Sequence, residues 1–106
     1  MGLFEFLFRE LKGDKSTTRV YVICSSSKGE HNVGHWEVPS DPNTFRLGCL
    51  KSLQTSADAC FGQGNFIVHA SVATLGSHAI CTRGPCQGMT LCLRLVPNGI
   101  FHAALN

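Results

Sequence analysis

The spacing of apolar residues changes along the chain, and each change indicates a different element. The first apolar residues fall on one stripe of a helix that Gly13 would end, namely Leu3, Phe4, Leu7, Phe8 and Leu11. Glu5 and Arg9 form a favourable pair, four residues apart, on the other side of this stripe. We therefore predict an N-terminal amphipathic helix that packs across a sheet.

Two β-strands are predicted next. Residues 19–24 are rich in β-branched and aromatic side chains, and the serines of residues 25–29 are typical of a turn. A second, shorter strand is expected over residues 33–38, with Trp36 and Val38 facing the core. Both segments are therefore assigned to the sheet.

An internal helix is predicted over residues 44–60. Asp41 followed by Pro42 is typical of an N-cap and a first-turn proline. Gly48 weakens this helix, because glycine is unfavourable in a helix interior. Beyond the cap, apolar residues repeat at helical spacing: Leu47, Leu50, Leu53, Ala57 and Cys60.

After Gly62 the pattern changes to short apolar runs separated by glycine-containing turns. In the third run every second residue is apolar, which is the period of a half-buried strand. The Asn-Gly pair at residues 98 and 99 is a strong signal for a tight turn, so an antiparallel meander is expected. The runs cover residues 65–75, 79–83, 89–96 and 100–105.

Together these elements predict a single domain over residues 1–106. The fold class is α+β: an antiparallel sheet of five to six strands with an N-terminal amphipathic helix and one internal helix. The first strand of the meander is apolar on both sides, so each of its faces needs a cover. Its expected faces are Ile67, Ala73 and Leu75 on one side and Phe66, Val68 and Val72 on the other.

Composition and charge exclude several classes of function. Only 15% of the residues are charged and the net charge is +2, so the chain lacks the basic stripe of a nucleic-acid-binding surface. Residues 59–82 carry no charge, but their glycines, Asn65 and histidines are incompatible with a transmembrane helix. Charged residues interrupt the first apolar stretch, so no secretory signal is expected. We predict a cytoplasmic protein without a transmembrane segment or a nucleic-acid partner.

The cysteines are expected to be free thiols, because a cytoplasmic compartment is reducing. They are Cys24, Cys49, Cys60, Cys81, Cys86 and Cys92. An alternative is a structural zinc held by His78, Cys81, Cys86 and Cys92, whose spacing is H-x2-C-x4-C-x5-C. This pattern lacks the C-x2-C knuckle of specific zinc signatures. The preferred interpretation is therefore a protein without a metal or any other cofactor.

Charge is unevenly distributed between the two halves of the chain. All acidic residues lie at or before Asp58, and residues 59–106 carry only Arg83 and Arg94. An exposed sheet normally has a charged face and charged edge strands. This asymmetry predicts that the C-terminal half is covered by a protein partner or by a second copy in a homodimer. The expected interface lies on the uncharged last strand, at Ile100, Phe101, Ala103 and Leu105.

The segment Gly84-Pro85-Cys86-Gln87-Gly88, together with residues 98–103, resembles the C-terminal end of chymotrypsin-like viral cysteine proteases. The resemblance implies that Cys86 is a nucleophile beside an oxyanion hole of backbone N–H groups, with His35 as its upstream base. It covers only about twenty residues. Those enzymes need two barrels, and Gln87 replaces a glycine of their turn. A small Cys-His hydrolase is therefore kept as an alternative.

Residues 33–38, Val-Gly-His-Trp-Glu-Val, resemble the histidine box of lipid-acyltransferase-like proteins that some picornaviruses carry, but the Asn-Cys pair of that family is missing. Short, thiol-rich chains of this kind also resemble leader or accessory proteins of RNA viruses. The preferred hypothesis is a non-enzymatic protein-interaction module that self-associates or binds a protein partner. A Cys-His hydrolase and a zinc-stabilised module are the alternatives.

Overall fold

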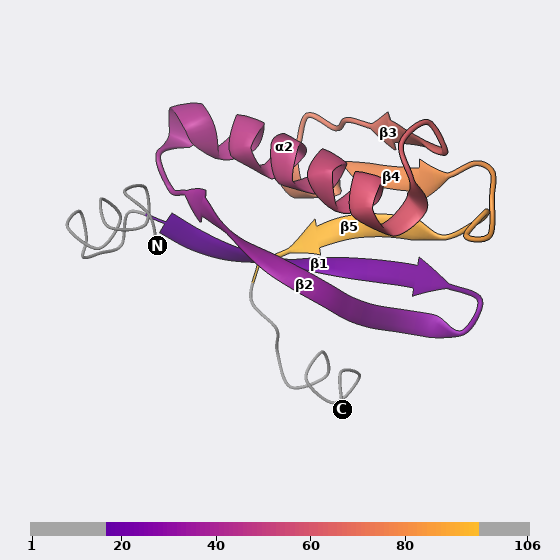
Figure 1. The fold of residues 1–106 in the computed structure, drawn as a ribbon. Coiled ribbons are helices and arrows are strands. Elements are labelled where there is room, and N and C mark those ends of the chain that lie inside the picture. Colours follow the sequence, from indigo (N-terminus) through magenta and orange to yellow (C-terminus); the bar gives the residue numbers. More distant parts are fainter. Residues whose placement is uncertain (1–16, 96–106) are drawn as a thin grey trace.

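The computed structural model describes residues 17–95. In this part of the chain, five strands form one antiparallel sheet and a long helix crosses one face of it (Figure 1). This arrangement confirms the α+β class. The predicted N-terminal helix and the predicted strand over residues 100–105 lie outside the described residues. The elements are β1 (Thr17–Ser26), β2 (Gly29–Pro39), α2 (Pro42–Phe61), β3 (Phe66–His69), the short 3₁₀-helix η1 (Thr74–Gly76), β4 (His78–Cys81) and β5 (Thr90–Arg94).

The two N-terminal strands form a long hairpin at one side of the sheet. Their antiparallel pairing runs from Thr17 opposite Pro39 to Ser26 opposite Gly29. Gly29 has a φ of 114°, a conformation that glycine adopts without a side-chain clash, and this permits the tight connection. Both predicted strands are confirmed, and both extend beyond their predicted bounds.

The C-terminal strands form the predicted meander, which joins the hairpin in the middle of the sheet. The strand order is β2-β1-β5-β4-β3, so β5 pairs with both β1 and β4. The strands β2 and β3 are therefore the two edges of the described sheet. The predicted turn over residues 84–88 connects β4 to β5.

The prediction of one strand over residues 65–75 is wrong, because β3 ends at His69. The hydroxyl of Ser77 accepts a hydrogen bond from the Ser71 N–H at 2.9 Å, and the Ser71 hydroxyl accepts one from the Ala73 N–H at 3.2 Å. Such side-chain bonds to the backbone compete with strand pairing and turn the chain. Val72 is consequently 90% exposed, and the strand faces predicted for Val72, Ala73 and Leu75 do not exist.

The internal helix α2 begins as predicted. The Asp41 carboxylate accepts a hydrogen bond from the Asn43 N–H at 3.1 Å, which caps the first turn, and Pro42 occupies that turn. At the other end, Gly62 has a φ of 93° and donates its N–H to the Asp58 carbonyl. Within residues 17–95, no helix combines the length and the apolar character that crossing a membrane requires.

The buried side of α2 differs from the predicted stripe. Leu47, which was expected to face the core, is 68% exposed. Relative to the prediction, a different side of α2 faces the sheet. Apolar residues at every fourth position pack on the sheet, and Ser52 and Ser56 are buried beside them. The apolar residues are Phe45, Cys49, Leu53, Ala57 and Phe61. Two small hydroxyl residues thus belong to the buried side of α2, whereas Leu47 of the predicted stripe does not.

Gly48 lies where α2 packs against Val38 of β2. A Cβ atom at this position would lie 2.7 Å from Cγ1 of Val38, a residue that is only 1% exposed. The glycine that weakens the helix prediction therefore allows the helix to approach the sheet closely. Its cost in helix propensity is offset by contact with the core.

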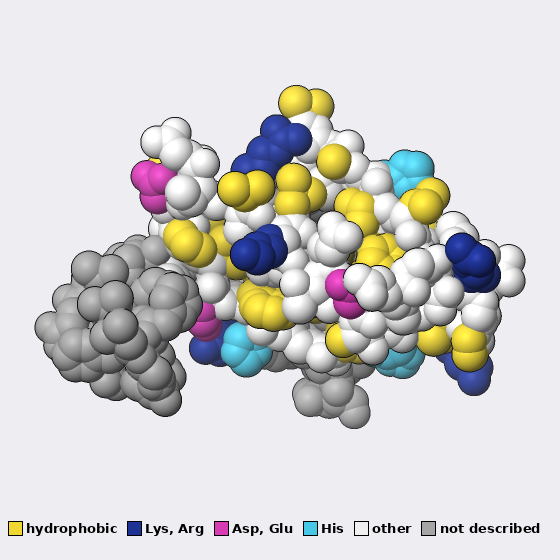
Figure 2. All heavy atoms as spheres, turned by 45° about the horizontal axis from the view of Figure 1, so that its top comes forward, with side chains coloured by type: hydrophobic (Ala, Val, Ile, Leu, Met, Phe, Trp, Pro, Cys, Tyr) yellow, Lys and Arg dark blue, Asp and Glu magenta, His cyan; other side chains and the backbone are white. Residues whose placement is uncertain are grey.

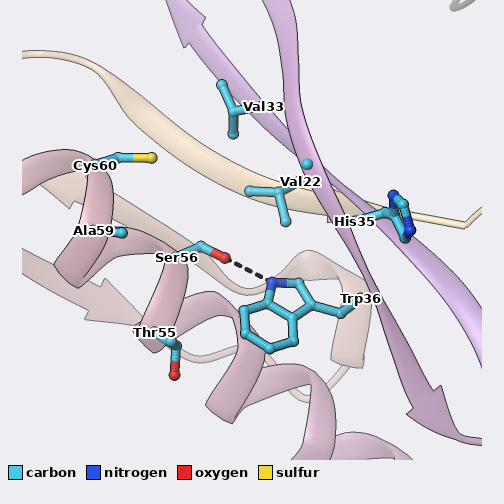
Figure 3. Close-up of a pocket in the computed structure, with 9 residues that line it drawn as sticks. Val22, Val33, His35, Trp36, Thr55, Ser56, Ala59 and Cys60 are labelled. Carbon is cyan, nitrogen blue, oxygen red and sulfur yellow. Dashed lines mark hydrogen bonds between the residues drawn. The ribbon is translucent and has the colours of Figure 1, made fainter. Parts of the chain in front are cut away.

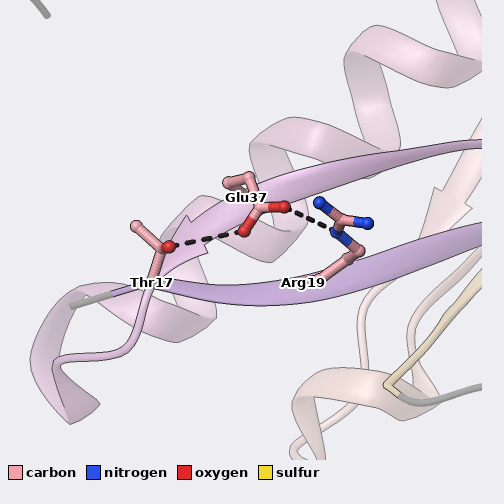
Figure 4. A network of polar contacts seen from close by, with 3 residues as sticks. All are labelled: Thr17, Arg19 and Glu37. Atoms are coloured by element: carbon pink, nitrogen blue, oxygen red, sulfur yellow. Dashed lines mark hydrogen bonds and ion pairs between the residues drawn. The ribbon is translucent and has the colours of Figure 1, made fainter. Parts of the chain in front are cut away.

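The face of the sheet opposite α2, called the far face below, carries ion pairs between strands. The Arg19 Nε lies 2.6 Å from a carboxylate oxygen of Glu37, and Thr17 donates to the same carboxylate at 3.3 Å (Figure 4). Arg94 reaches across β1 and donates to both oxygens of Glu30, at 2.8 and 2.6 Å. These polar pairs connect β2 to the adjacent strand β1 and, across β1, to β5.

Candidate interaction groove

The edge strand β2 is the longer of the two described edges. It has eleven residues, whereas β3 has four. No strand from residues 17–95 pairs with the outer side of β2. Because the backbone N–H and C=O groups on an outer edge are unpaired, they offer a template for another strand.

Two cavities lie between β2 and α2, and together with their lining residues they are called the β2–α2 groove below. The first has a volume of about 280 Å³ and is lined by Val22, Val33, Gly34, His35, Trp36, Thr55, Ser56, Ala59 and Cys60 (Figure 3). The second has a volume of about 190 Å³ and is lined by Trp36, Glu37, Val38, Pro39, Gly48, Lys51, Ser52 and Thr55. Only Trp36 and Thr55 line both cavities, so they separate the two halves of the groove.

The indole ring of Trp36 is fixed by a hydrogen bond to the helix. Its Nε1–H donates to the Ser56 hydroxyl at 2.8 Å (Figure 3). The residue is nevertheless 37% exposed, so one part of the ring is directed to solvent. An aromatic ring that is held at its polar atom and exposed on its apolar surface is suited to contact a partner.

A β-bulge shapes the first cavity. Val22 pairs with Gly34 and Ile23 pairs with Asn32, so Val33 has no partner on β1. Bulges change the direction of a side chain and are common at sheet edges. Here the bulge leaves Val33 in the wall of the first cavity, where it is 48% exposed.

The groove carries little charge. Lys51 and Glu37 line only the second cavity, and the carboxylate of Glu37 is bound to Arg19. The hydrogen bond from Arg19 to Glu37 raises the pKa of the guanidinium. Apart from His35, whose ring contacts Tyr21 on the far face, the remaining lining residues are glycines, apolar residues, small hydroxyl residues and Cys60. This lining favours an uncharged occupant.

The outer surface of α2 contains a third, shallower hollow next to the groove. It has a volume of about 560 Å³ and is lined by Leu47, Leu50, Lys51, Gln54 and Thr55. Figure 2, which brings the α2 side forward, shows apolar side chains on this side between isolated charged ones. Thr55 thus borders both the groove and the hollow, while Gln54 borders only the hollow.

The predicted Cys-His pair is not brought together. The rings of His35 and Tyr21 have centroids 6.1 Å apart on the far face, and Figure 3 shows His35 and Trp36 directed to opposite sides of β2. Cys86 lies on the helix side of the sheet, where its thiol donates to the Cys60 carbonyl at 3.8 Å. Because the sheet separates the two side chains, the geometry offers no support for a proton transfer from Cys86 to His35.

The four residues of the alternative zinc site also lie apart. His78 and Cys92 pair on the far face, whereas Cys81 is 1% exposed in the core and donates to the Arg83 carbonyl at 3.2 Å. Cys86 contacts the end of α2. Among residues 17–95, no group of three or more His, Cys, Asp or Glu side chains is arranged to hold a metal ion.

The predicted interface residues Ile100, Phe101, Ala103 and Leu105 lie outside the described residues. The sequence prediction also missed the groove, because it expected Trp36 to face the core together with Val38. One available signal was the series of small residues along α2 at Gly48, Ser52 and Ser56, which leaves space beside a strand.

No family model, curated protein or solved structure matches this chain.

Proposed function

We propose that this chain is a protein-interaction module that self-associates by strand addition, with residues 100–105 of one copy bound in the β2–α2 groove of a second copy. The observation that carries the proposal is the groove itself, in which two cavities flank Trp36 beside a long edge strand whose outer side pairs with no other strand of residues 17–95. An edge strand supplies backbone hydrogen bonds to an added strand, and pockets beside it select alternate side chains.

The spacing of the cavities along β2 supports this occupant. The cavities lie at Gly34 and Val38, and Trp36 stands between them. These positions follow one another at intervals of two residues, the period of side chains on one face of a strand. An occupant that pairs with β2 therefore meets a cavity, an indole ring and a second cavity at every second residue.

Residues 100–105 have a matching pattern. In a strand, Phe101, Ala103 and Leu105 share one side, with two bulky residues flanking a small one. The bulky side chains suit the two cavities, and the alanine suits the position opposite Trp36. The segment is also uncharged, which agrees with the low charge of the groove.

Exchange of this segment between two copies produces a closed dimer. Each copy offers one groove and one segment, so a two-fold axis satisfies both at once. The backbone hydrogen bonds added along β2 and the burial of Phe101 and Leu105 both stabilise the dimer. In this proposal, the surface that mediates self-association lies on β2 and α2.

Sedimentation analysis of the full chain at tens of micromolar tests the proposal. Wild type is expected to sediment as a dimer rather than as a monomer of 11.5 kDa. Phe101→Lys removes the bulky donor residue, and Thr55→Arg fills both cavities, so each variant is expected to be monomeric. Gln54→Arg adds the same charge at the neighbouring exposed position outside the groove and is expected to remain dimeric.

Mixing the two monomeric variants gives a sharper test. The Phe101→Lys chain keeps an intact groove, and the Thr55→Arg chain keeps an intact segment, so together they are expected to form a heterodimer with one complete contact. A wild-type monomer, a dimer that survives both substitutions, or a mixture that stays monomeric would each overturn the proposal. Circular dichroism of every variant establishes that the fold is retained.

A further inference from the structure

Three cysteines from distant parts of the chain converge at the C-terminal end of α2. Cys60 lies in the last turn of the helix, Cys86 in the turn between β4 and β5, and Cys24 near the end of β1. The Cys86 thiol donates to the carbonyl of Cys60 at 3.8 Å. The end of the helix and the β4–β5 turn are thus in contact through these residues.

The electrostatics of the thiols reflect the same proximity. Burial raises the pKa of Cys60, and the neighbouring Cys86 raises it further. Burial also raises the pKa of Cys24, with further contributions from Cys60, Cys86 and Cys92. Negative charge on one sulfur therefore disfavours negative charge on the others, as expected for thiols that lie close together.

The other cysteines do not share this position. Cys49 and Cys81 are each 1% exposed within the core. Cys92 pairs with His78 on the far face. Cys60 is exposed and Cys86 is half-buried, so these two neighbouring thiols combine contact with access from solvent.

The geometry points to Cys60 and Cys86 as a dithiol site that hydroperoxides oxidise to a disulfide. The small fraction of Cys60 that is thiolate, which the raised pKa of this thiol limits near neutral pH, attacks the O–O bond of hydrogen peroxide. This step yields a sulfenic acid and, after protonation of the leaving hydroxide, one water molecule, and it is expected to become faster as the pH rises. The Cys86 thiol then attacks the sulfenic sulfur, the S–S bond forms, and a second water molecule leaves. Overall the two thiols lose two hydrogen atoms and the peroxide is reduced to two molecules of water.

The turn that carries Cys86 is held in place by its backbone. The Gln87 N–H donates to the Gly84 carbonyl at 3.1 Å, and the Met89 N–H donates to the Cys86 carbonyl at 2.9 Å. These bonds order the turn, and the contact of the Cys86 thiol with the Cys60 carbonyl places the Cys86 sulfur next to residue 60.

The dithiol site borders the β2–α2 groove, because Cys60 lines the first cavity of the groove. This consequence rests on the proposed function, whereas the disulfide itself does not. An occupant of the first cavity shields Cys60, so oxidation is expected to slow down as the dimer forms.

Peroxide treatment of the native full chain, followed by alkylation under denaturing conditions and mass spectrometry, tests the site. Wild type at low concentration is expected to lose two hydrogen atoms and to yield one cross-linked peptide pair containing Cys60 and Cys86. Cys60→Ser and Cys86→Ser are expected to abolish the cross-link, and Cys92→Ser is the matched control on the far face. In Cys86→Ser, a 1,3-dione probe is expected to label Cys60 as a sulfenic acid.

A cross-link between Cys24 and Cys60, cross-links between chains, or six unchanged thiols after the peroxide is consumed would each overturn the assignment. Oxidation of the monomeric Phe101→Lys chain, whose first cavity stays empty and leaves Cys60 accessible, separates this proposal from the previous one. The disulfide is expected to form in this variant at a rate that does not depend on protein concentration. Its absence there would reject the dithiol site and leave the groove proposal intact.

Discussion

The two faces of the sheet are stabilised in different ways. The α2 side is a dry core of small and medium apolar side chains, with Leu53 and Leu91 each at most 1% exposed. The far face combines ion pairs between exposed side chains, such as Arg94 with Glu30, with the fully buried side chain of Ile23. Burial of apolar area contributes far more stability than an exposed ion pair does. Because most of the buried apolar side chains lie on the helix side, that side is expected to contribute the larger share of the stability.

The largest expected difference is between one leucine on the helix side and one isoleucine on the far face. Leu53→Ala is expected to lower the free energy of unfolding by about 3 kcal/mol, because it leaves a cavity under α2. Ile67→Ala is expected to cost less than about 1 kcal/mol, since Ile67 is 49% exposed. Urea denaturation followed by circular dichroism measures both. Equal costs would show that the far face contains a second core.

A smaller effect is expected where Gly48 of α2 packs against Val38 of β2. Gly48→Ala is expected to destabilise the protein by about 1–2 kcal/mol, because crowding of Val38 outweighs a gain of about 1 kcal/mol in helix propensity. Gln54→Ala, on the exposed side of the same helix, is the control and is expected to be neutral. A double-mutant cycle with Val38→Ala measures the coupling. A stabilising Gly48→Ala would mean that the helix can move away from the strand.

The smallest effect concerns the far face and its response to acid. The hydrogen bond from Arg94 lowers the pKa of Glu30 below its ordinary value of 4.5. The ion pair therefore contributes stability above that ordinary value, and this contribution is lost as the pH falls through the lower pKa of the folded state. Because both side chains are about 40% exposed, the contribution is expected to be only a few tenths of a kcal/mol.

Glu30→Gln tests this linkage. The difference in unfolding free energy between wild type and the variant is expected to be constant near neutral pH and to shrink as the pH falls below the ordinary carboxylate value of 4.5. Glu30→Gln combined with Arg94→Gln is the control that removes both partners. A difference that does not change with pH as the carboxylate becomes protonated would assign the effect to packing instead of charge.

Local signals in the sequence predicted the strands β1 and β2 and the internal helix α2 correctly. The β-branched run before a glycine turn is sufficient for β1, and Asp41-Pro42 is sufficient for the start of α2. The end of β3 was missed, because hydrogen bonds of Ser71 and Ser77 outweigh the apolar pattern of residues 65–75. The rotation of α2 was also missed, since it depends on which residue faces Trp36 across the groove.

The candidate sites depend on tertiary placement even more strongly. The Cys86–His35 pair could have been doubted from alternation alone, because a strand that turns Trp36 to the core turns His35 away from it. No sequence signal brings Cys60 next to Cys86, since their contact forms only when α2 packs beside the β4–β5 turn. The two cavities likewise exist only where the helix and the edge strand meet.

The order of the strands has a consequence for the folding pathway. The hairpin of β1 with β2 and the meander of β3, β4 and β5 each join neighbours in the sequence. The ladder between β1 and β5 instead joins residues from opposite ends of the described chain, with Tyr21 beside Arg94. Closing so long a loop costs entropy before any contact repays it, so non-local ladders slow folding. We therefore expect two locally folded halves that form early, and a late step in which one ladder closes the sheet.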